Sequence, residues 1–304
     1  MEENMNKSEL RQLMQAAMCG DVEAQTHLGY LYYEGEGVEQ NYNEAVKWYK
    51  KAAKQDYAPA QLTLGECYYF GECVEQDYKK AVYWYEKGLK QEKHLVAEYG
   101  EETEKDLFVP AQYNLGNCYY YGDGVEQDYN KAAYWYTKAA KQGDADAQYS
   151  LGDCYYYGDG VEQNYEKAVE WYTKAAKQDY PPAQYSLAFC YANGEGIEQN
   201  YEKAVEWYRK AAEQDYPPAQ NNLGMCYYDG KGVEQNYEKA VEWFKKAAEQ
   251  DNGEAQRSLG NCYVLGAGVP QDYEKAKMWH DKAKENGVEF DEELLKKMEK
   301  AFNS

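Results

Sequence analysis

The sequence is poor in the residues that most often carry chemistry or bind nucleic acid. Three histidines occur among its 304 residues, and 33 Lys and Arg stand against 54 Asp and Glu. The formal net charge of −21 would repel a phosphate backbone, so nucleic acid is not an expected partner. No run approaches the ~20 apolar residues of a membrane-spanning helix, so membrane insertion is not expected either.

Residues 1–20 carry several charged side chains and no apolar run, unlike a secretory signal peptide. We therefore expect a cytoplasmic protein, and a trimmed signal peptide or export by a non-classical route stay open as alternatives. The acidity keeps an extended surface soluble, and it would also steer a basic partner toward the chain.

Catalytic and metal-binding motifs are missing as well. His27, His94 and His280 lie far apart in the chain, and no Cys-x-x-Cys or His-x-x-x-His pair offers zinc spacing. There is no Gly-x-x-x-x-Gly-Lys phosphate loop, and the Gly-Asp-Gly turns lack the alternating acids of a calcium loop. We therefore expect no catalytic residues, no metal site and no cofactor.

What the sequence does contain is a repeat marked by tryptophan. Successive tryptophans lie 36 residues apart, except for one gap of 51 between Trp84 and Trp135. Each lies 24 residues after an alanine, which we number position 0 of its repeat. The tryptophans are Trp48, Trp84, Trp135, Trp171, Trp207, Trp243 and Trp279. A fixed period of this length predicts a solenoid, in which stacked units bury faces that one unit alone would expose.

Each repeat is predicted to form two helices joined by a turn. In the fourth copy, Ala147, Leu151, Cys154 and Tyr155 cluster on one helix face. A Gly-x-Gly turn ends this first helix, and Asn164 then caps the second. Glycine at position 5 costs ~1 kcal/mol within a helix, so we infer that another helix approaches closely there. Cysteines at position 7 are predicted to be free buried thiols, because stacked helices lie ~8–10 Å apart and a disulfide needs Cα atoms within ~7 Å.

The copy from Ala147 to Gln178 reads AQYSLGDCYYYGDGVEQNYEKAVEWYTKAAKQ. Its pattern A-x-x-x-L-G-x-x-Y-x-x-G-x-G-V, followed by Y-x-x-A-x-x-W-Y-x-x-A-A, resembles the Sel-1-like repeat family, which is related to tetratricopeptide repeats. The resemblance covers residues 24–290. It implies an all-α fold, a right-handed α/α superhelical solenoid whose first helices line the concave side. It also implies adaptor, scaffold or signalling roles, and several bacterial members contact host or envelope proteins.

On this basis we predict three parts. An N-terminal capping helix lies within residues 1–23 and a C-terminal capping helix within 291–304, because an open stack needs covered ends. Between them, seven 36-residue helix-turn-helix repeats fill residues 24–290, and the second is lengthened by an insertion near 88–110. The predicted repeats are 24–59, 60–110, 111–146, 147–182, 183–218, 219–254 and 255–290.

Positions 2, 6 and 9 of the first helix fall opposite its core face and are rich in tyrosine, amide and acid groups. Tyrosine offers a large contact area at small entropic cost, so we predict that this face binds a protein or peptide partner. The alternative is that the nearly invariant tyrosines at position 9 pack between neighbouring first helices. The predicted partner-binding residues are Tyr113, Asn117, Tyr120, Tyr149, Asp153, Tyr156, Tyr185, Phe189, Asn221 and Met225.

We therefore expect a non-catalytic scaffold or adaptor, a monomer that holds a partner, favoured to be basic, in a tyrosine-rich concave groove. One alternative is a secreted or regulatory effector that binds through the charged insertion. A less favoured alternative is a β-lactamase-like hydrolase, a label that some secreted relatives with disulfide-bonded repeats carry. The chain lacks their paired cysteines and has no Ser-x-x-Lys motif.

Overall fold

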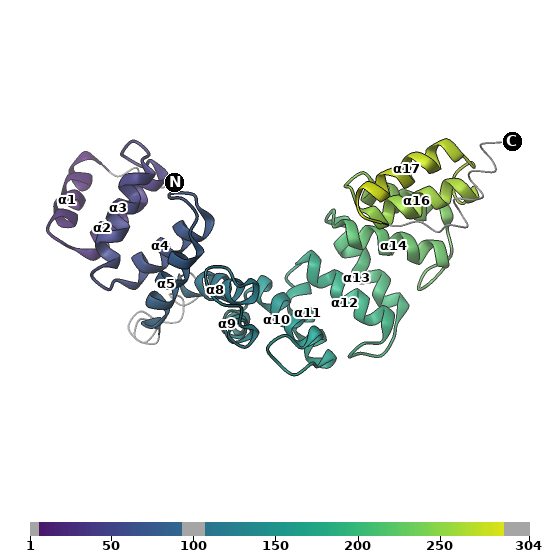
Figure 1. Cartoon of the computed structure of the whole chain (residues 1–304), viewed down its shortest axis with the longest axis horizontal. Helices are drawn as coiled ribbons and strands as arrows, with labels where there is room; N and C mark the ends of the chain where they lie inside the picture. Colours follow the sequence, from purple (N-terminus) through teal and green to yellow (C-terminus); the bar gives the residue numbers. More distant parts are fainter. Residues whose placement is uncertain (1–5, 93–106, 289–304) are drawn as a thin grey trace. The chain divides into compact units, whose positions relative to one another are not determined.

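The computed structural model describes residues 6–92 and 107–288, and within these ranges every regular element is a helix (Figure 1). Helices α1 to α10 belong to one compact unit, residues 1–163, and α11 to α17 to a second, residues 164–304. The helices are α1 Lys7–Met18, α2 Val22–Glu34, α3 Tyr42–Ala53, α4 Ala58–Phe70, α5 Tyr78–Leu89, α8 Val109–Tyr121, α9 Tyr129–Lys141, α10 Ala145–Tyr157, α11 Tyr165–Ala176, α12 Pro181–Asn193, α13 Tyr201–Glu213, α14 Pro217–Asp229, α15 Tyr237–Ala248, α16 Gly253–Leu265 and α17 Tyr273–Glu285.

The helices alternate in role along the chain. We call α2, α4, α8, α10, α12, α14 and α16 the first helices, and α3, α5, α9, α11, α13, α15 and α17 the second helices. Within each unit, a first helix packs on the second helix that follows it, and that second helix packs on the next first helix. This succession confirms the predicted all-α solenoid of stacked helix pairs.

The helix ends follow the expected chemistry. Asn164 caps α11 by accepting a hydrogen bond from the backbone N–H of Lys167 at 2.8 Å. Gly158 ends α10 in the left-handed conformation, with φ of 83°, which glycine adopts without a steric penalty. Pro181 opens α12, where a missing N–H leaves no bond unmade. The predicted helix end at the Gly-x-Gly turn and the predicted cap at Asn164 are therefore confirmed.

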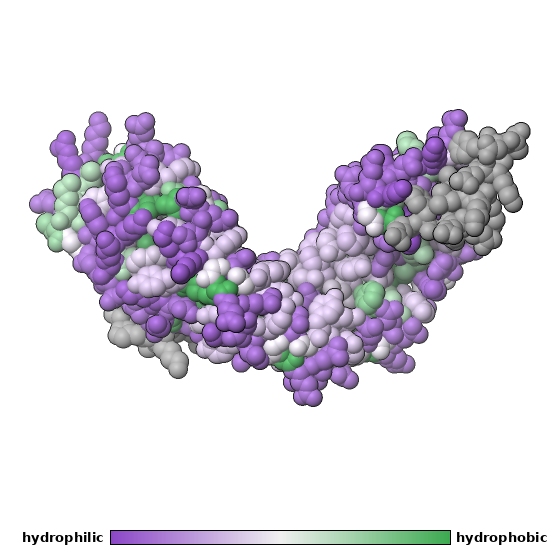
Figure 2. All heavy atoms as spheres, viewed as in Figure 1, coloured by the Kyte–Doolittle hydropathy of each residue, from purple (hydrophilic) through white to green (hydrophobic). Residues whose placement is uncertain are grey.

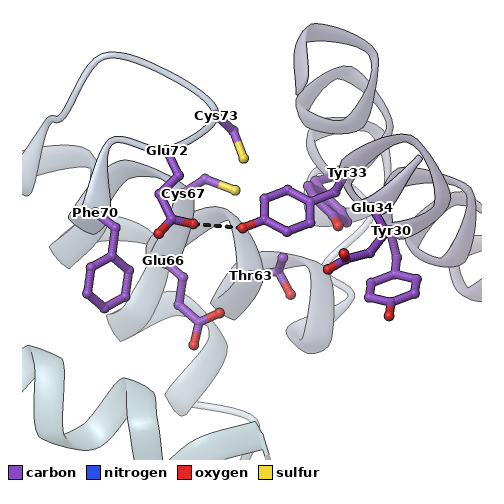
Figure 3. Close-up of a pocket in the computed structure, with 10 residues that line it drawn as sticks. Tyr30, Tyr33, Glu34, Thr63, Glu66, Cys67, Phe70, Glu72 and Cys73 are labelled. Carbon is purple, nitrogen blue, oxygen red and sulfur yellow. Dashed lines mark hydrogen bonds between the residues drawn. The ribbon is translucent and has the colours of Figure 1, made fainter. Parts of the chain in front are cut away.

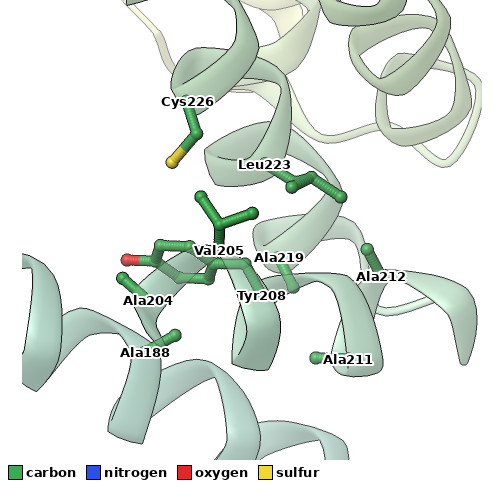
Figure 4. Close-up of a cluster of buried hydrophobic side chains, with 9 residues drawn as sticks. All are labelled: Ala188, Ala204, Val205, Tyr208, Ala211, Ala212, Ala219, Leu223 and Cys226. Carbon is green, nitrogen blue, oxygen red and sulfur yellow. The ribbon is translucent and has the colours of Figure 1, made fainter. Parts of the chain in front are cut away.

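Glycine at position 5 lets the two helices of a repeat lie close together. A Cβ atom at Gly116 would lie 2.6 Å from the Tyr136 ring, and one at Gly224 would lie 2.7 Å from the Phe244 ring. The ring at position 25 thus fills the space that a side chain would need, which confirms the inferred close approach. Ala188 takes the glycine's place in the fifth repeat and shares a core cluster with Tyr208 (Figure 4).

The core alternates small residues with large ones, as that cluster shows. Its buried members are Ala188, Ala204, Val205, Tyr208, Ala211, Ala212, Ala219, Leu223 and Cys226, which come from α12, α13 and α14 (Figure 4). Because the cluster spans two repeats, most of its burial is gained only on stacking. The six cysteines at position 7 are free and buried, as predicted.

A buried glutamine at position 1 joins each repeat to the one before it. The Nε2 of Gln220 donates to the carbonyl oxygen of Ala212 in the preceding repeat at 3.2 Å. Its Oε1 accepts a bond from Gln250, in the turn that follows the second helix of its own repeat, at 3.0 Å. The glutamines at this position are Gln25, Gln61, Gln112, Gln148, Gln184, Gln220 and Gln256, all buried. Since a buried amide is costly unless both ends are bonded, this arrangement fixes the register between repeats.

The insertion changes this arrangement in one place. Gln112 donates not to a backbone carbonyl but to Glu92 Oε1, at 2.8 Å. Glu92 is buried and pairs with Lys138 of α9. A carboxylate and a lysine thus replace the missing carbonyl where the extra residues begin, so the second repeat still joins the third.

The lysines of the second helices lie over aromatic rings. Each tryptophan at position 24 is followed three residues later by a lysine whose Nζ lies over the indole ring. The distance from Nζ to the ring centroid ranges from 3.5 Å in Lys51–Trp48 to 5.8 Å in Lys87–Trp84. The other pairs are Lys138–Trp135, Lys174–Trp171, Lys210–Trp207, Lys246–Trp243 and Lys282–Trp279. Such cation–π contacts are worth ~0.5–1 kcal/mol each at exposed sites, and they give the lysines a structural role.

The second glycine of each Gly-x-Gly turn touches the preceding repeat. A Cβ atom at Gly160 would lie 2.0 Å from the Tyr129 carbonyl oxygen, and one at Gly196 would lie 2.3 Å from that of Tyr165. Because backbone atoms cannot move aside, a residue without a side chain is needed at this position for neighbouring repeats to lie so close together. In the second repeat Cys73 stands at this position, and its side chain is buried.

The two ends differ in what the structure describes. The helix α1 packs on α2, and Ala17 shares a cluster with Ala24, Leu28 and Trp48. The predicted C-terminal capping helix, 291–304, and residues 93–106 of the insertion lie outside the described residues.

We predict that Gln220→Met lowers the free energy of unfolding by about 1–3 kcal/mol, because it removes the hydrogen bonds that the buried Gln220 amide makes with the Ala212 carbonyl and with the Gln250 amide. Urea unfolding followed by tryptophan fluorescence would measure the loss. The matched control is Gln12→Met on an exposed face of α1, for which less than about 0.5 kcal/mol is expected. Equal stability of both variants would contradict the role given to the buried glutamine.

We predict that Gly116→Ala also destabilises the chain. Alanine would improve helix propensity by ~1 kcal/mol, but overpacking against the Tyr136 ring costs ~1–3 kcal/mol, so a net loss of up to about 2 kcal/mol is expected. The reverse exchange, Ala188→Gly, should destabilise too, because it removes a buried methyl group and weakens the helix. A Gly116→Ala variant more stable than the parent chain in the same unfolding assay would refute the close-packing argument.

Candidate functional site

The first helices carry almost no positive charge. They contain a single Lys or Arg, Arg257 on α16, whereas every second helix contains at least two lysines. Their acids are Glu23, Glu34, Glu66, Asp146, Asp153, Asp229 and Glu254. On the face in view in Figure 2, hydrophobic side chains form small patches among hydrophilic ones.

In the N-terminal unit a hollow of about 440 Å³ opens between α2, α3 and α4 (Figure 3). We call it the first hollow. Its lining residues are Tyr30, Tyr33, Glu34, Tyr49, Thr63, Glu66, Cys67, Phe70, Glu72 and Cys73. Four of these are aromatic and three are glutamates, and this lining contains no Lys, Arg or His. The hollow is therefore both aromatic and negatively charged.

The electrostatics of the first hollow centre on Glu66. Burial, with a smaller contribution from the charge of Glu72, raises the pKa of the Glu66 carboxyl to about 7. Tyr33 Oη donates a hydrogen bond to Glu72 Oε2 at 2.7 Å, and this bond raises the tyrosine pKa (Figure 3). Contact between the two thiols lowers the pKa of Cys73 and, together with burial, raises that of Cys67.

An equivalent hollow of about 480 Å³ lies in the C-terminal unit, between α14, α15 and α16. We call it the second hollow. Its lining residues are Asn221, Met225, Tyr228, Phe244, Glu254, Arg257, Ser258, Asn261 and Leu265. Arg257 forms an ion pair with Glu254 within this lining, at 2.5 Å. Both hollows thus form between adjacent first helices, over the aromatic residue at position 25.

The tyrosines predicted at position 9 are held within the scaffold. Tyr120 packs against Tyr129 of its own second helix, with ring centroids 5.1 Å apart. Its Oη donates to Asp159 Oδ2 in the next turn at 2.9 Å, just as Tyr33 donates to Glu72. Tyr156 on α10 is half-buried and packs edge-on against Tyr157. These contacts indicate that the tyrosines at position 9 help to hold the scaffold together.

Several predicted residues at positions 2 and 6 are also engaged. Asn117 accepts a hydrogen bond from Tyr136 Oη at 2.8 Å, and Tyr113 lies 5.9 Å from the Tyr136 ring between centroids. Tyr185 packs against Tyr208 at 5.7 Å in the same way. These half-buried side chains therefore offer a partner part of their surface only.

The other predicted residues fall into two groups. Tyr149 and Asp153 lie half-buried on α10. Asn221 and Met225 line the second hollow, and Phe189 and Met225 line an adjoining cavity of about 270 Å³. Met225 is 39% exposed. The structure thus brings together Phe189, Asn221 and Met225, and nothing in it tests their role in binding.

The sequence prediction missed a row of exposed hydrophobic residues at position 10. Phe70 is 56% exposed, Tyr121 67%, Tyr157 65% and Leu265 55%. Phe70 and Leu265 line the first and second hollows. Position 10 lies 40° from position 6 on a helical wheel, so the same wheel could have found this row.

The described part of the chain offers neither a metal-binding cluster nor a membrane-spanning helix. Residues 6–92 and 107–288 contain no group of three or more His, Cys, Asp and Glu arranged to hold a metal ion. No helix in these same ranges has both the length and the apolar character needed to cross a membrane.

The repeats of this chain match a known family of repeat proteins. A family model described as Sel1 repeat matches residues 22–57, 58–92, 109–144, 145–180, 181–216, 217–252 and 253–288. A search of curated proteins gave no match.

Two solved structures are similar over nearly the whole chain. One is a protective antigen present in uropathogenic Escherichia coli strains that displays an SLR fold, with 37% identity and a TM-score of 0.77 over 93% of this chain. The chain spans only 57% of that protein's length. The other is a Sel1 repeat protein from Oxalobacter formigenes, with 35% identity and a TM-score of 0.72, covering 98% of this chain and 83% of that one.

We predict that Glu66→Gln stabilises the chain at pH 8 and has little effect at pH 5. The native pKa of about 7 lies above the ordinary 4.5, so the native state binds the proton more tightly and stability falls as pH rises between these values. The gain at pH 8 is expected to be about 1–2 kcal/mol, below the full linkage value because the side chain is partly solvated. Thermal unfolding at both pH values checks this, and a loss of stability at pH 8 would contradict it.

Proposed function

The chain belongs to the Sel1 repeat family, and from that premise we propose that it is a non-catalytic scaffold whose first helices hold a partner polypeptide. Repeats of this kind typically serve as interaction scaffolds, and a stack of helix pairs provides a long surface rather than an enclosed site. The single observation that carries the proposal is the recurrence of exposed hydrophobic residues at position 10, two of which, Phe70 and Leu265, line the first and second hollows.

This row is unusual for a water-exposed surface. Its members are large side chains left more than half exposed: Phe70, Tyr121, Tyr157 and Leu265. Isolated exposed hydrophobic residues need no explanation, but here they recur at one repeat position. Aromatic side chains beside hollows are typical anchors of protein interfaces, because they bury a large area for little loss of conformational entropy.

The charge distribution supports a basic partner. Most lysines of the described residues lie on the second helices, many of them over tryptophan rings. The first helices contain acids and a single arginine, Arg257. An acidic surface favours encounter with a basic polypeptide and disfavours an acidic one. A partner that binds through the insertion remains the alternative, and its residues 93–106 lie outside the described part of the chain.

The proposal is tested with a phage-displayed library of random dodecapeptides, selected on the full chain, with the strongest peptide then synthesised and labelled. Replacing both Tyr121 and Tyr157 by serine should weaken binding at least ~10-fold, since aromatic anchors at interfaces each contribute ~1–2 kcal/mol or more. Fluorescence anisotropy measures the dissociation constants.

The control replaces Tyr83 and Tyr134, each 57% exposed on second helices, by serine. It removes the same chemical groups at similar exposure and should leave binding within ~2-fold, because contacts outside an interface contribute little. Failure to select any peptide, or equal losses in the two double variants, would refute the proposed surface.

A further inference from the structure

We infer that the first hollow receives a lysine or arginine side chain of the bound polypeptide. This inference rests on the proposed function, and it names the chemistry of one contact. Three features of the first hollow support it: its rings, its unpaired carboxylates and its difference from the second hollow.

The rings of the first hollow suit a cation. Tyr30 and Phe70 are exposed at its rim, at 44% and 56%, and Tyr33 lies between them on the inner side. A cation within ~6 Å of an aromatic face is attracted by the ring's negative charge density. The chain itself places lysines over rings on its second helices, for example Lys174 at 3.7 Å from the Trp171 centroid. A volume of about 440 Å³ lies within the range of ligand-binding pockets.

The carboxylates of the first hollow lack a cation. Among the described residues Glu34 and Glu66 make no hydrogen bond or ion pair, and Glu72 accepts one bond from a neutral tyrosine. Glu66 is half-buried, so its negative charge is only partly solvated. The raised pKa of Glu66 is the consequence, since burial without a positive partner disfavours the ionised form. A cation placed beside Glu66 would favour its ionised form and lower its pKa.

The second hollow shows what occupies the equivalent place elsewhere in the chain. There Arg257, at position 2 of its repeat, pairs with Glu254. In the second repeat the corresponding residues are Leu62 and Pro59, and Leu62 is buried. The second hollow therefore contains a guanidinium from the chain itself, whereas the lining of the first hollow has none, so a cation in the first hollow would come from the bound polypeptide.

The inference implies a pH dependence of binding. The groups that face Glu66 are Tyr30, Tyr33 and Glu34 from α2, Tyr49 from α3, Glu72 and Cys73 from the turn after α4, and Tyr85 from α5. None of them is cationic, so the ionisation of Glu66 sets how negative the first hollow is near pH 7. Because a bound cation favours the carboxylate, affinity rises as pH rises through about 7 and falls below it.

The test uses the labelled dodecapeptide selected on the full chain, with each Lys or Arg replaced in turn by norleucine. Dissociation constants are measured at pH 6 and pH 8 for the parent chain, for Glu66→Gln and for the charge-matched control Glu75→Gln, whose side chain is exposed in a loop. Glu66→Gln should weaken binding at least ~10-fold at pH 8 and much less at pH 6, as for loss of one partner of a desolvated charge pair. Glu75→Gln should change it less than ~2-fold, as for a rim charge.

One norleucine replacement should reproduce the effect of Glu66→Gln, and combining the two should add little further loss. If Glu66→Gln and Glu75→Gln act alike, or if the peptide needs no basic residue, the inference is overturned. The proposed function would survive that result as long as the Tyr121 and Tyr157 double variant still loses binding. If no peptide is selected, the proposed function fails and the inference fails with it.

Discussion

The buried glutamine at position 1 is the constraint on which the rest of the structure depends. Its amide bonds to the end of the preceding repeat and to the turn after its own second helix, as Gln220 does with Ala212 and Gln250. Apolar packing alone would tolerate sliding between similar repeats, but a buried amide that is hydrogen-bonded to both neighbours tolerates very little. Each repeat is therefore placed on its neighbour in one register, and the hollows between first helices recur at the same positions.

In this register the two kinds of helix present different side chains. The second helices carry the lysines, and their tryptophans and position-25 rings cover the core. The first helices, in which Arg257 is the single Lys or Arg, have acids and aromatic side chains at their exposed positions. The basic partner that we propose has a structural rationale, because most lysines lie on the second helices and leave the first helices with little positive charge. The first hollow shows this imbalance, since its lining contains three glutamates and no Lys, Arg or His.

Much of the fold could be predicted from the sequence, because it depends on local chemistry that repeats. The helix periods, the cap at Asn164 and the glycine at Gly158 each act within a few residues, so one copy shows them all. The glutamine at position 1 was equally visible, but polarity alone suggests exposure, and its two partners lie in other helices. The site was harder to predict. Whether Tyr120 is free depends on Asp159 in the turn of the next repeat, and the pKa of Glu66 depends on its burial and on the charge of Glu72 in the turn after α4.

The measurement that tests the central claim most directly is photocrosslinking of the selected dodecapeptide, carrying benzoylphenylalanine at its centre, to the full chain. Mass spectrometry would locate the attachment. The account predicts attachment to the first helices near Phe70, Tyr121, Tyr157 or Leu265, with attachment suppressed by an excess of unlabelled peptide. Competed attachment to the second helices or to residues 93–106 would contradict it and would place the binding surface on the opposite helices or on the insertion.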